Sequence, residues 1–156
     1  PDGLMLGKAL GGGVMPVSAF VAKREILSLF TPGSHGSTFA GNPLAAALGL
    51  EALKVLEDEK LPERSFRLGQ YFQDGLRSIH TPVFSQIRGR GLWIGLDINP
   101  EIISGRDFCL KLMEKGVLSK ETHEKTIRLA PPLVISEKEL DFALKAIKEV
   151  VEEIER

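Results

Sequence analysis

From residue 60 onward, the spacing of apolar residues alternates between the helical and the strand period. Helical spacing follows Pro62, spans Asp107 to Lys115 before Gly116, and begins again at Ser136, where Glu139 completes a capping box. Strand patterns occupy the ranges 83–88, 92–98, 117–118 and 126–129. The resulting order, α-β-β-α-β-β-α, predicts a compact α/β unit.

The segment 92–98 has the clearest strand pattern. Apolar residues at 92, 94, 96 and 98 alternate with Trp93, Gly95 and Asp97, which predicts one buried and one mixed face. We expect Trp93 to pack against neighbouring side chains. Arg88 and Arg90, in an Arg-Gly-Arg-Gly stretch, are interpreted as solvated turn residues or as members of surface ion pairs.

Residues 1–59 have a different composition, and the part before residue 42 is rich in glycine. Strands are predicted at 4–6 and 16–22, and a loop at 31–43. Asn42 caps a helix that begins at Pro43 and runs to about Glu57. Its predicted apolar face comprises Leu44, Leu48, Ala52, Val55 and Leu56. We therefore expect two domains, 1–59 and 60–156. Because the chain starts with Pro1 in mid-domain, we expect it to be the C-terminal part of a longer protein.

Composition excludes several classes of function. The net charge of −1 gives no general attraction to nucleic acid or to anionic membranes. No apolar run reaches the roughly 20 residues that cross a bilayer. Cys109 is the only cysteine, so no internal disulfide can form, and three scattered histidines do not predict a metal site. These features favour a cytoplasmic protein.

Lys8 lies in a Leu-Gly-Lys-Ala-Leu-Gly-Gly-Gly run, residues 6–13. If the preceding strand is buried, burial favours the neutral amine, a nucleophile that condenses with aldehydes such as pyridoxal phosphate. Two other interpretations remain open from the residues alone. Lys8 can be an ordinary surface turn residue, or the run can be a phosphate loop, although Ala9 replaces the Ser or Thr that such a loop needs.

Three patterns in order carry a resemblance to a known family: residues 6–13, residues 35–45 (His-Gly-Ser-Thr-Phe-Ala-Gly-Asn-Pro-Leu-Ala) and residues 127–133 (Ile-Arg-Leu-Ala-Pro-Pro-Leu). Together they resemble the class III aminotransferases, pyridoxal-phosphate enzymes of fold type I. The resemblance implies that residues 1–59 end the large cofactor domain and that residues 60–156 form the small α/β domain.

The same resemblance implies roles for four residues. Lys8 would bind pyridoxal 5'-phosphate covalently and act as the catalytic base. Ser37 and Thr38 match the segment that binds the cofactor phosphate across a homodimer interface. Arg128, whose strand position turns it away from Ile127 and Leu129, would bind the carboxylate of the 2-oxo acid substrate. No role follows for His35 or His123.

The segment Lys120-Glu-Thr-His123 favours ornithine as the amino donor, with 2-oxoglutarate as the acceptor. Acetylornithine and 4-aminobutyrate are alternative donors, and a non-catalytic α/β interaction domain is the alternative from another class. In this family, the aspartate that contacts the cofactor nitrogen lies upstream of the lysine, outside this chain. We therefore expect the chain to be inactive alone.

Overall fold

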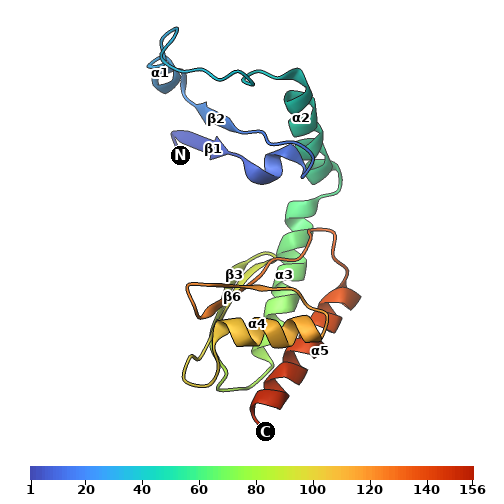
Figure 1. The fold of residues 1–156 in the computed structure, drawn as a ribbon. Coiled ribbons are helices and arrows are strands. Elements are labelled where there is room, and N and C mark those ends of the chain that lie inside the picture. The colour runs from blue at the N-terminus through green and yellow to red at the C-terminus, as the bar shows by residue number, and fades with distance from the viewer. The chain divides into compact units, whose positions relative to one another are not determined.

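The computed structural model describes all 156 residues, which form two compact units, Pro1–Lys60 and Leu61–Arg156 (Figure 1). The first unit contains β1 (Gly3–Leu6), the 3₁₀ helix η1 (Lys8–Gly11), β2 (Ala19–Ala22), α1 (Arg24–Leu27) and α2 (Pro43–Asp58). The second contains α3 (Leu61–Arg77), β3 (Phe84–Arg90), β4 (Trp93–Ile98), α4 (Gly105–Glu114), β5 (Lys120–Thr122), β6 (Thr126–Leu129) and α5 (Glu137–Ile154). None of these helices is long and apolar enough to cross a membrane.

The second unit has the predicted order of helices and strands. Its four strands form one antiparallel sheet in the order β3-β4-β6-β5. One strand prediction is wrong: Val117 and Leu118 have irregular backbone, and β5 begins at Lys120. Gly116, with φ of 85°, turns the chain out of α4, and the chain resumes strand geometry only after Ser119.

The core of the second unit lies between one face of this sheet and the three helices α3, α4 and α5. The predicted alternation in β4 is confirmed, because Ile94, Leu96 and Ile98 are fully buried. They pack with the apolar stripes of the helices and with β6, in a cluster that includes Leu68, Phe72, Leu76, Phe108, Leu112, Ile127, Leu140, Ile147 and Val150. Trp93 lies on the opposite face and is 70% exposed, so the expectation that it packs is wrong.

Side-chain caps begin α2 and α5 as the sequence predicts. Asn42 Oδ1 accepts hydrogen bonds from the backbone N–H groups of Leu44 and Ala45 at the start of α2. Ser136 and Glu139 form the reciprocal capping box of α5. Each cap satisfies backbone donors that have no partner within the helix, which fixes where the helix begins.

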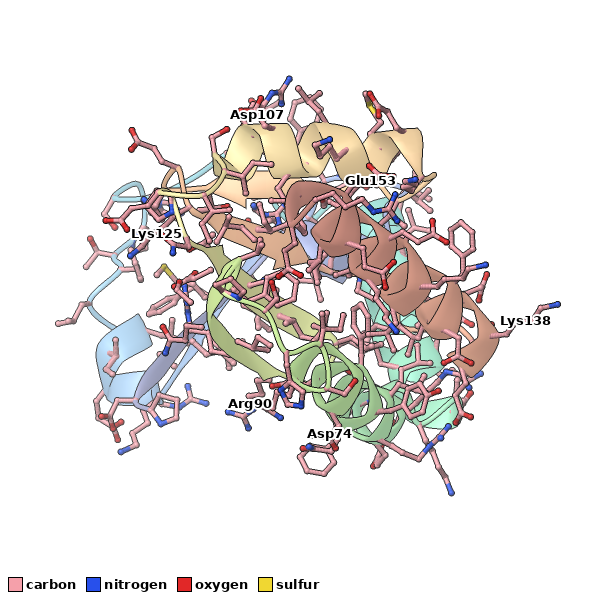
Figure 2. All side chains as sticks on the ribbon, turned by 90° about the horizontal axis from the view of Figure 1, so that it is seen from below. Asp74, Arg90, Asp107, Lys125, Lys138 and Glu153 are labelled. Atoms are coloured by element: carbon pink, nitrogen blue, oxygen red, sulfur yellow. The ribbon has the colours of Figure 1, made fainter.

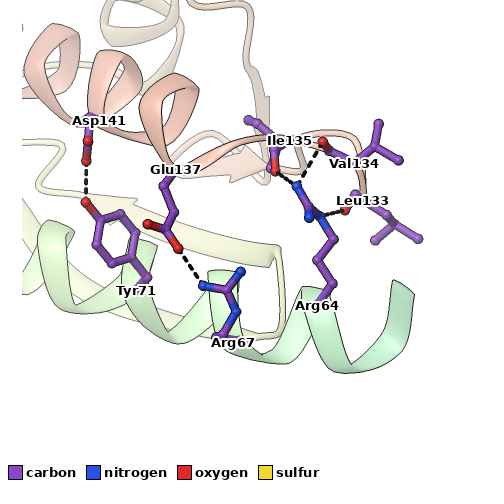
Figure 3. A network of polar contacts seen from close by, with 8 residues as sticks. All are labelled: Arg64, Arg67, Tyr71, Leu133, Val134, Ile135, Glu137 and Asp141. Atoms are coloured by element: carbon purple, nitrogen blue, oxygen red, sulfur yellow. Dashed lines mark hydrogen bonds and ion pairs between the residues drawn. The ribbon is translucent and has the colours of Figure 1, made fainter. Parts of the chain in front are cut away.

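Arg64 of α3 holds the segment that follows β6 (Figure 3). Its Nη2 donates to the carbonyl oxygens of Ile135 and Val134 at 2.6 and 3.2 Å, and its Nε donates to that of Leu133 at 3.2 Å. One guanidinium thus satisfies three consecutive carbonyl groups just before α5. Two side-chain pairs, Arg67–Glu137 and Tyr71–Asp141, further join α3 to α5.

The first unit has little core of its own. β1 and β2 form a two-stranded antiparallel ribbon in which Met5 pairs with Phe20, and most of its residues are exposed. The expectation of a buried strand before Lys8 is therefore wrong, because no further strand or helix covers this ribbon. A two-stranded ribbon is marginally stable by itself. The buried face of α2 also differs from the prediction: Ala45 and Gly49 are buried, whereas Leu44 and Val55 are exposed.

Gly69 provides a test of the packing in the second unit. A methyl group added there would overlap the backbone carbonyl of Gly91 in the β3–β4 turn. Gly69→Ala should therefore lower the free energy of unfolding by about 1–3 kcal/mol. Urea unfolding followed by circular dichroism measures the change. The matched control is Gln70→Ala, at the next position of α3 and exposed to solvent. Equal stability of the two variants would contradict this packing.

Candidate active site

Lys8 begins η1 and has a left-handed backbone, with φ of 50°. This region costs a side-chain-bearing residue roughly 1–3 kcal/mol, and such residues cluster at functional sites. The lysine is exposed and its amine makes no ion pair. Lys8 is therefore a free primary amine on a strained backbone. It is not the buried group that the sequence predicts, because the ribbon before it is open.

Helix α2 supports the segment that carries Lys8. The two elements lie side by side in the first unit. A methyl group at Gly49 of α2 would lie 3.7 Å from the carbonyl oxygen of Leu10, and one at Gly12 would lie 3.5 Å from the Cβ of Ala52. Gly12 also has φ of 62°, a conformation that glycine adopts without strain. The glycines after Lys8 thus allow the chain to turn and to approach α2 closely.

Ser37 and Thr38 lie in the exposed loop that leads to α2. Ser37 Oγ accepts a hydrogen bond from the backbone N–H of Phe39 at 3.3 Å. No hydrogen bond joins either residue to Lys8. The loop offers two hydroxyl groups next to Gly36, a donor set that suits a phosphate group.

Arg128 is placed as its strand pattern predicts. Its neighbours Ile127 and Leu129 are buried in the core, and Arg128 is exposed on the opposite face of β6. Its guanidinium makes no ion pair. Arg128 belongs to the second unit, whereas Lys8, Ser37 and Thr38 belong to the first.

The face of the sheet that the helices leave uncovered is called the open face here. The strand register places on it Gln86, Arg88, Arg90, Trp93, Gly95, Asp97, Lys120, Thr122, Thr126 and Arg128. Gly95 is the partner of both Arg88 and Arg128, and Arg128 is the partner of Lys120. Four cations on this face therefore accompany a single carboxylate, that of Asp97.

Asp97 is tied to two neighbours on the open face. Its Oδ2 lies 2.6 Å from Arg88 Nη1, and its Oδ1 accepts a hydrogen bond from Thr126 Oγ1, also at 2.6 Å. Arg88 Nη2 also donates to Thr126 Oγ1 at 3.3 Å. Arg88 and Arg90 both belong to β3, so the interpretation of these arginines as turn residues is wrong, whereas the alternative of an ion pair is confirmed for Arg88. No local pattern in the sequence indicates this network, because it depends on which residues face one another across β3, β4 and β6.

The side chain of Asp97 is only 8% exposed. Burial by itself raises the pKa of the carboxyl group, but the hydrogen bonds from Arg88 and Thr126 and the charge of Arg88 outweigh it and hold the pKa below its usual value. Asp97 is therefore ionised at neutral pH, and its negative charge is matched by the positive charge of Arg88.

These residues and this fold define a class of protein: the chain belongs to the class III aminotransferase family, whose sequence profile (Aminotransferase class-III) matches residues 1–151. Among its relatives is the ornithine aminotransferase of Exiguobacterium sp., with 58% identity over 151 residues. That alignment covers 97% of this chain and 37% of the relative. The chain thus spans little more than a third of the length of the relatives it matches.

Two solved structures have the same arrangement of backbone. One is the ornithine aminotransferase of Toxoplasma gondii, with a TM-score of 0.94 and 44% identity over 99% of this chain and 37% of that chain. The other is the acetylornithine aminotransferase of Elizabethkingia anophelis, with a TM-score of 0.90 and 46% identity over 98% of this chain and 41% of that chain. Both confirm that the α/β fold is that of an aminotransferase.

The Asp97 network predicts a pH-dependent effect of Asp97→Asn. A carboxyl group whose folded pKa is lowered stabilises the fold above its unfolded pKa, and this stabilisation is lost as the pH falls through the folded value. Asp97→Asn should therefore cost about 1–3 kcal/mol at pH 7, and the difference from the wild type should shrink below about pH 4. Urea unfolding at several pH values measures it. A difference that does not depend on pH would contradict the ionised network.

Proposed function

We propose that this chain, as part of a longer protein, acts in the transfer of the terminal amino group of ornithine to 2-oxoglutarate. The proposal rests chiefly on Lys8, a free amine on a strained backbone in a chain of the class III aminotransferase family. The name of the Exiguobacterium relative, 58% identical to this chain, supports ornithine as the donor. The products would be glutamate semialdehyde and glutamate, formed by a ping-pong route.

Pyridoxal 5'-phosphate is the proposed cofactor. The T. gondii structure is described as having this cofactor at its active site in partial occupancy. The residues of this chain fit such a group: Lys8 offers an amine without an ion-pair partner, and Ser37 and Thr38 offer hydroxyl groups for the phosphate. The cofactor, when bound, supplies an electron sink for the carbon that loses its proton.

The amine of Lys8 would then carry out proton transfer. Lys8 would hold the cofactor through its aldehyde group, and Nζ, when free, would take and return the proton of the substrate carbon. General acid–base catalysis of this kind contributes about 10²–10⁴-fold to a rate. Arg128, a free guanidinium with a planar pair of donors, would hold the 2-oxo acid by its carboxylate.

The proposed assembly is a cytoplasmic homodimer with shared active sites. Ser37 and Thr38 make no hydrogen bond with Lys8, which suits a loop that serves the neighbouring subunit. The exposed apolar side chains of the first unit, among them Met5 and Leu50, need covering by other parts of the protein or by a partner. We also propose that the chain is inactive without the aspartate and phosphate loop that the family has upstream of its lysine.

A second candidate donor is acetylornithine. The acetylornithine aminotransferase of E. anophelis is 46% identical to this chain, slightly more than the T. gondii enzyme at 44%. Both donors present a primary amino group, so Lys8 and Arg128 serve either reaction. Transamination of 4-aminobutyrate and a non-catalytic interaction role are further candidate functions, and the free amine of Lys8 argues against the non-catalytic role.

The substitution Lys8→Ala in the full-length protein tests whether Lys8 binds the cofactor and transfers the proton. The wild type should hold pyridoxal phosphate with a visible absorption band and use ornithine in preference to N-acetylornithine. The variant should lack the absorption band, and its rate of transamination should fall by at least about 10²-fold. Lys54→Ala, an exposed lysine of α2, is the matched control. An unchanged band and rate in Lys8→Ala would refute the assignment.

Mixing subunits tests the shared sites. Lys8→Ala and Thr38→Ala proteins should each be impaired, whereas unfolding and refolding them together should restore about a quarter of the wild-type activity. The reason is that half of the random dimers would contain one site with an intact Lys8 and an intact Thr38. Activity no higher than the mean of the two separate variants would mean that each site is built from one subunit.

A further inference from the structure

The loop that joins α1 to α2 (Figure 1) carries Ser37 and Thr38 and begins with an aromatic contact. The rings of Phe30 and His35 have centroids 5.4 Å apart and are tilted by 48° to each other. This separation is within the range of favourable aromatic pairs. The contact therefore closes residues 30–35 into a compact turn.

Hydrogen bonds within the same residues give this turn a fixed shape. The backbone N–H of Ser34 donates to the carbonyl oxygen of Thr31 at 2.9 Å, and Gly33 between them has φ of 82°. Proline at the second position and a glycine with positive φ at the third are typical of a type II turn. Ser34 Oγ also donates to the Thr31 carbonyl oxygen at 2.7 Å and accepts from the Thr31 N–H at 3.0 Å. The backbone that leads into His35 is therefore ordered by its own residues.

The hydroxyl-bearing residues are held on their other side as well. Ser37 accepts hydrogen bonds from two backbone N–H groups, that of Phe39 at its Oγ and that of Ala40 at its carbonyl oxygen. Asn42 then caps α2, and its own N–H donates to the carbonyl oxygen of Phe39 at 3.3 Å. Ser37 and Thr38 therefore lie between the aromatic pair and the helix cap.

Order in this loop matters for binding an anion. Fixing a flexible backbone in one conformation costs free energy, and a loop that already holds its bound conformation avoids part of that cost. The side chains of Ser37 and Thr38 are short, so the positions of their hydroxyl groups follow the backbone closely. The contact between Phe30 and His35 acts on that backbone from immediately upstream.

We propose that Phe30 and His35 are positioning residues for the cofactor phosphate. This inference rests on the proposed function, in which Ser37 and Thr38 bind that phosphate. The two rings hold the loop in the conformation that presents both hydroxyl groups. His35 acts through the packing of its ring, so neither its nitrogen atoms nor its charge is required.

The cofactor affinity of the full-length apoprotein tests the proposal, with pyridoxal phosphate and pyridoxal compared by absorbance titration. Pyridoxal has the same aldehyde but no phosphate, so its affinity reports on every part of the site except the phosphate contacts. His35→Ala should weaken binding of pyridoxal phosphate by about three- to tenfold, the effect of one aromatic contact, and leave pyridoxal binding unchanged. Thr38→Ala, which removes a hydrogen bond to a charged group, should weaken binding of pyridoxal phosphate by at least about tenfold.

Further variants separate the ring contact from other effects. His35→Phe keeps an aromatic ring against Phe30 and should retain the wild-type affinity for pyridoxal phosphate. Phe30→Ala should match His35→Ala, and the double variant should bind no more weakly than either, because both changes break the same contact. The controls lie in the second unit: His80→Ala replaces an exposed histidine, and Lys138→Ala replaces a lysine whose side chain projects from α5 into solvent (Figure 2).

The positioning role is overturned if His35→Ala binds pyridoxal phosphate as the controls do, or if it weakens pyridoxal binding equally. It is also overturned if His35→Phe is as impaired as His35→Ala. A loss of affinity in Thr38→Ala alone would leave the proposed phosphate site standing and refute the role of the aromatic pair. Phosphate-specific affinity that depends on His35, in a protein that does not transaminate ornithine, would support the positioning role and refute the proposed function.

Discussion

One-sided burial of the four-stranded sheet determines the organisation of the second unit. Ile94, Leu96 and Ile127 are fully buried beneath three helices, so the alternate positions of the same strands must face the other way. Arg88, Asp97, Lys120 and Arg128 occupy those positions. The apolar core therefore positions the charged face directly, without any loop between the two.

Much of this fold could be predicted from the sequence because local rules and tertiary packing agree in the second unit. Helical spacing in α3 and α5, strand alternation in β4 and the capping box at Ser136 all match the structure. The prediction fails at Val117 and Leu118, where two apolar residues are too few to separate a strand from a connection. It also fails at β1, which stays mostly exposed because β2 is its only partner strand.

Those features of the candidate site that follow from the strand alternation of side chains or from a sequence motif could be predicted. The outward direction of Arg128 follows from its two apolar neighbours, and Lys8 follows from the surrounding glycines and the family pattern. The left-handed backbone of Lys8 and the contact between Arg88 and Asp97 have no such local signal. The first requires atomic geometry, and the second requires the register of β3 and β4, which places Arg88 diagonally opposite Asp97.

The hairpin of β5 and β6 has a consequence for how this family can vary. Its connection holds the residues from 123 to 125 between the paired Thr122 and Thr126. An insertion or deletion of one residue there would change which side chains meet across the hairpin. The length of this turn therefore determines that Lys120 stands opposite Arg128.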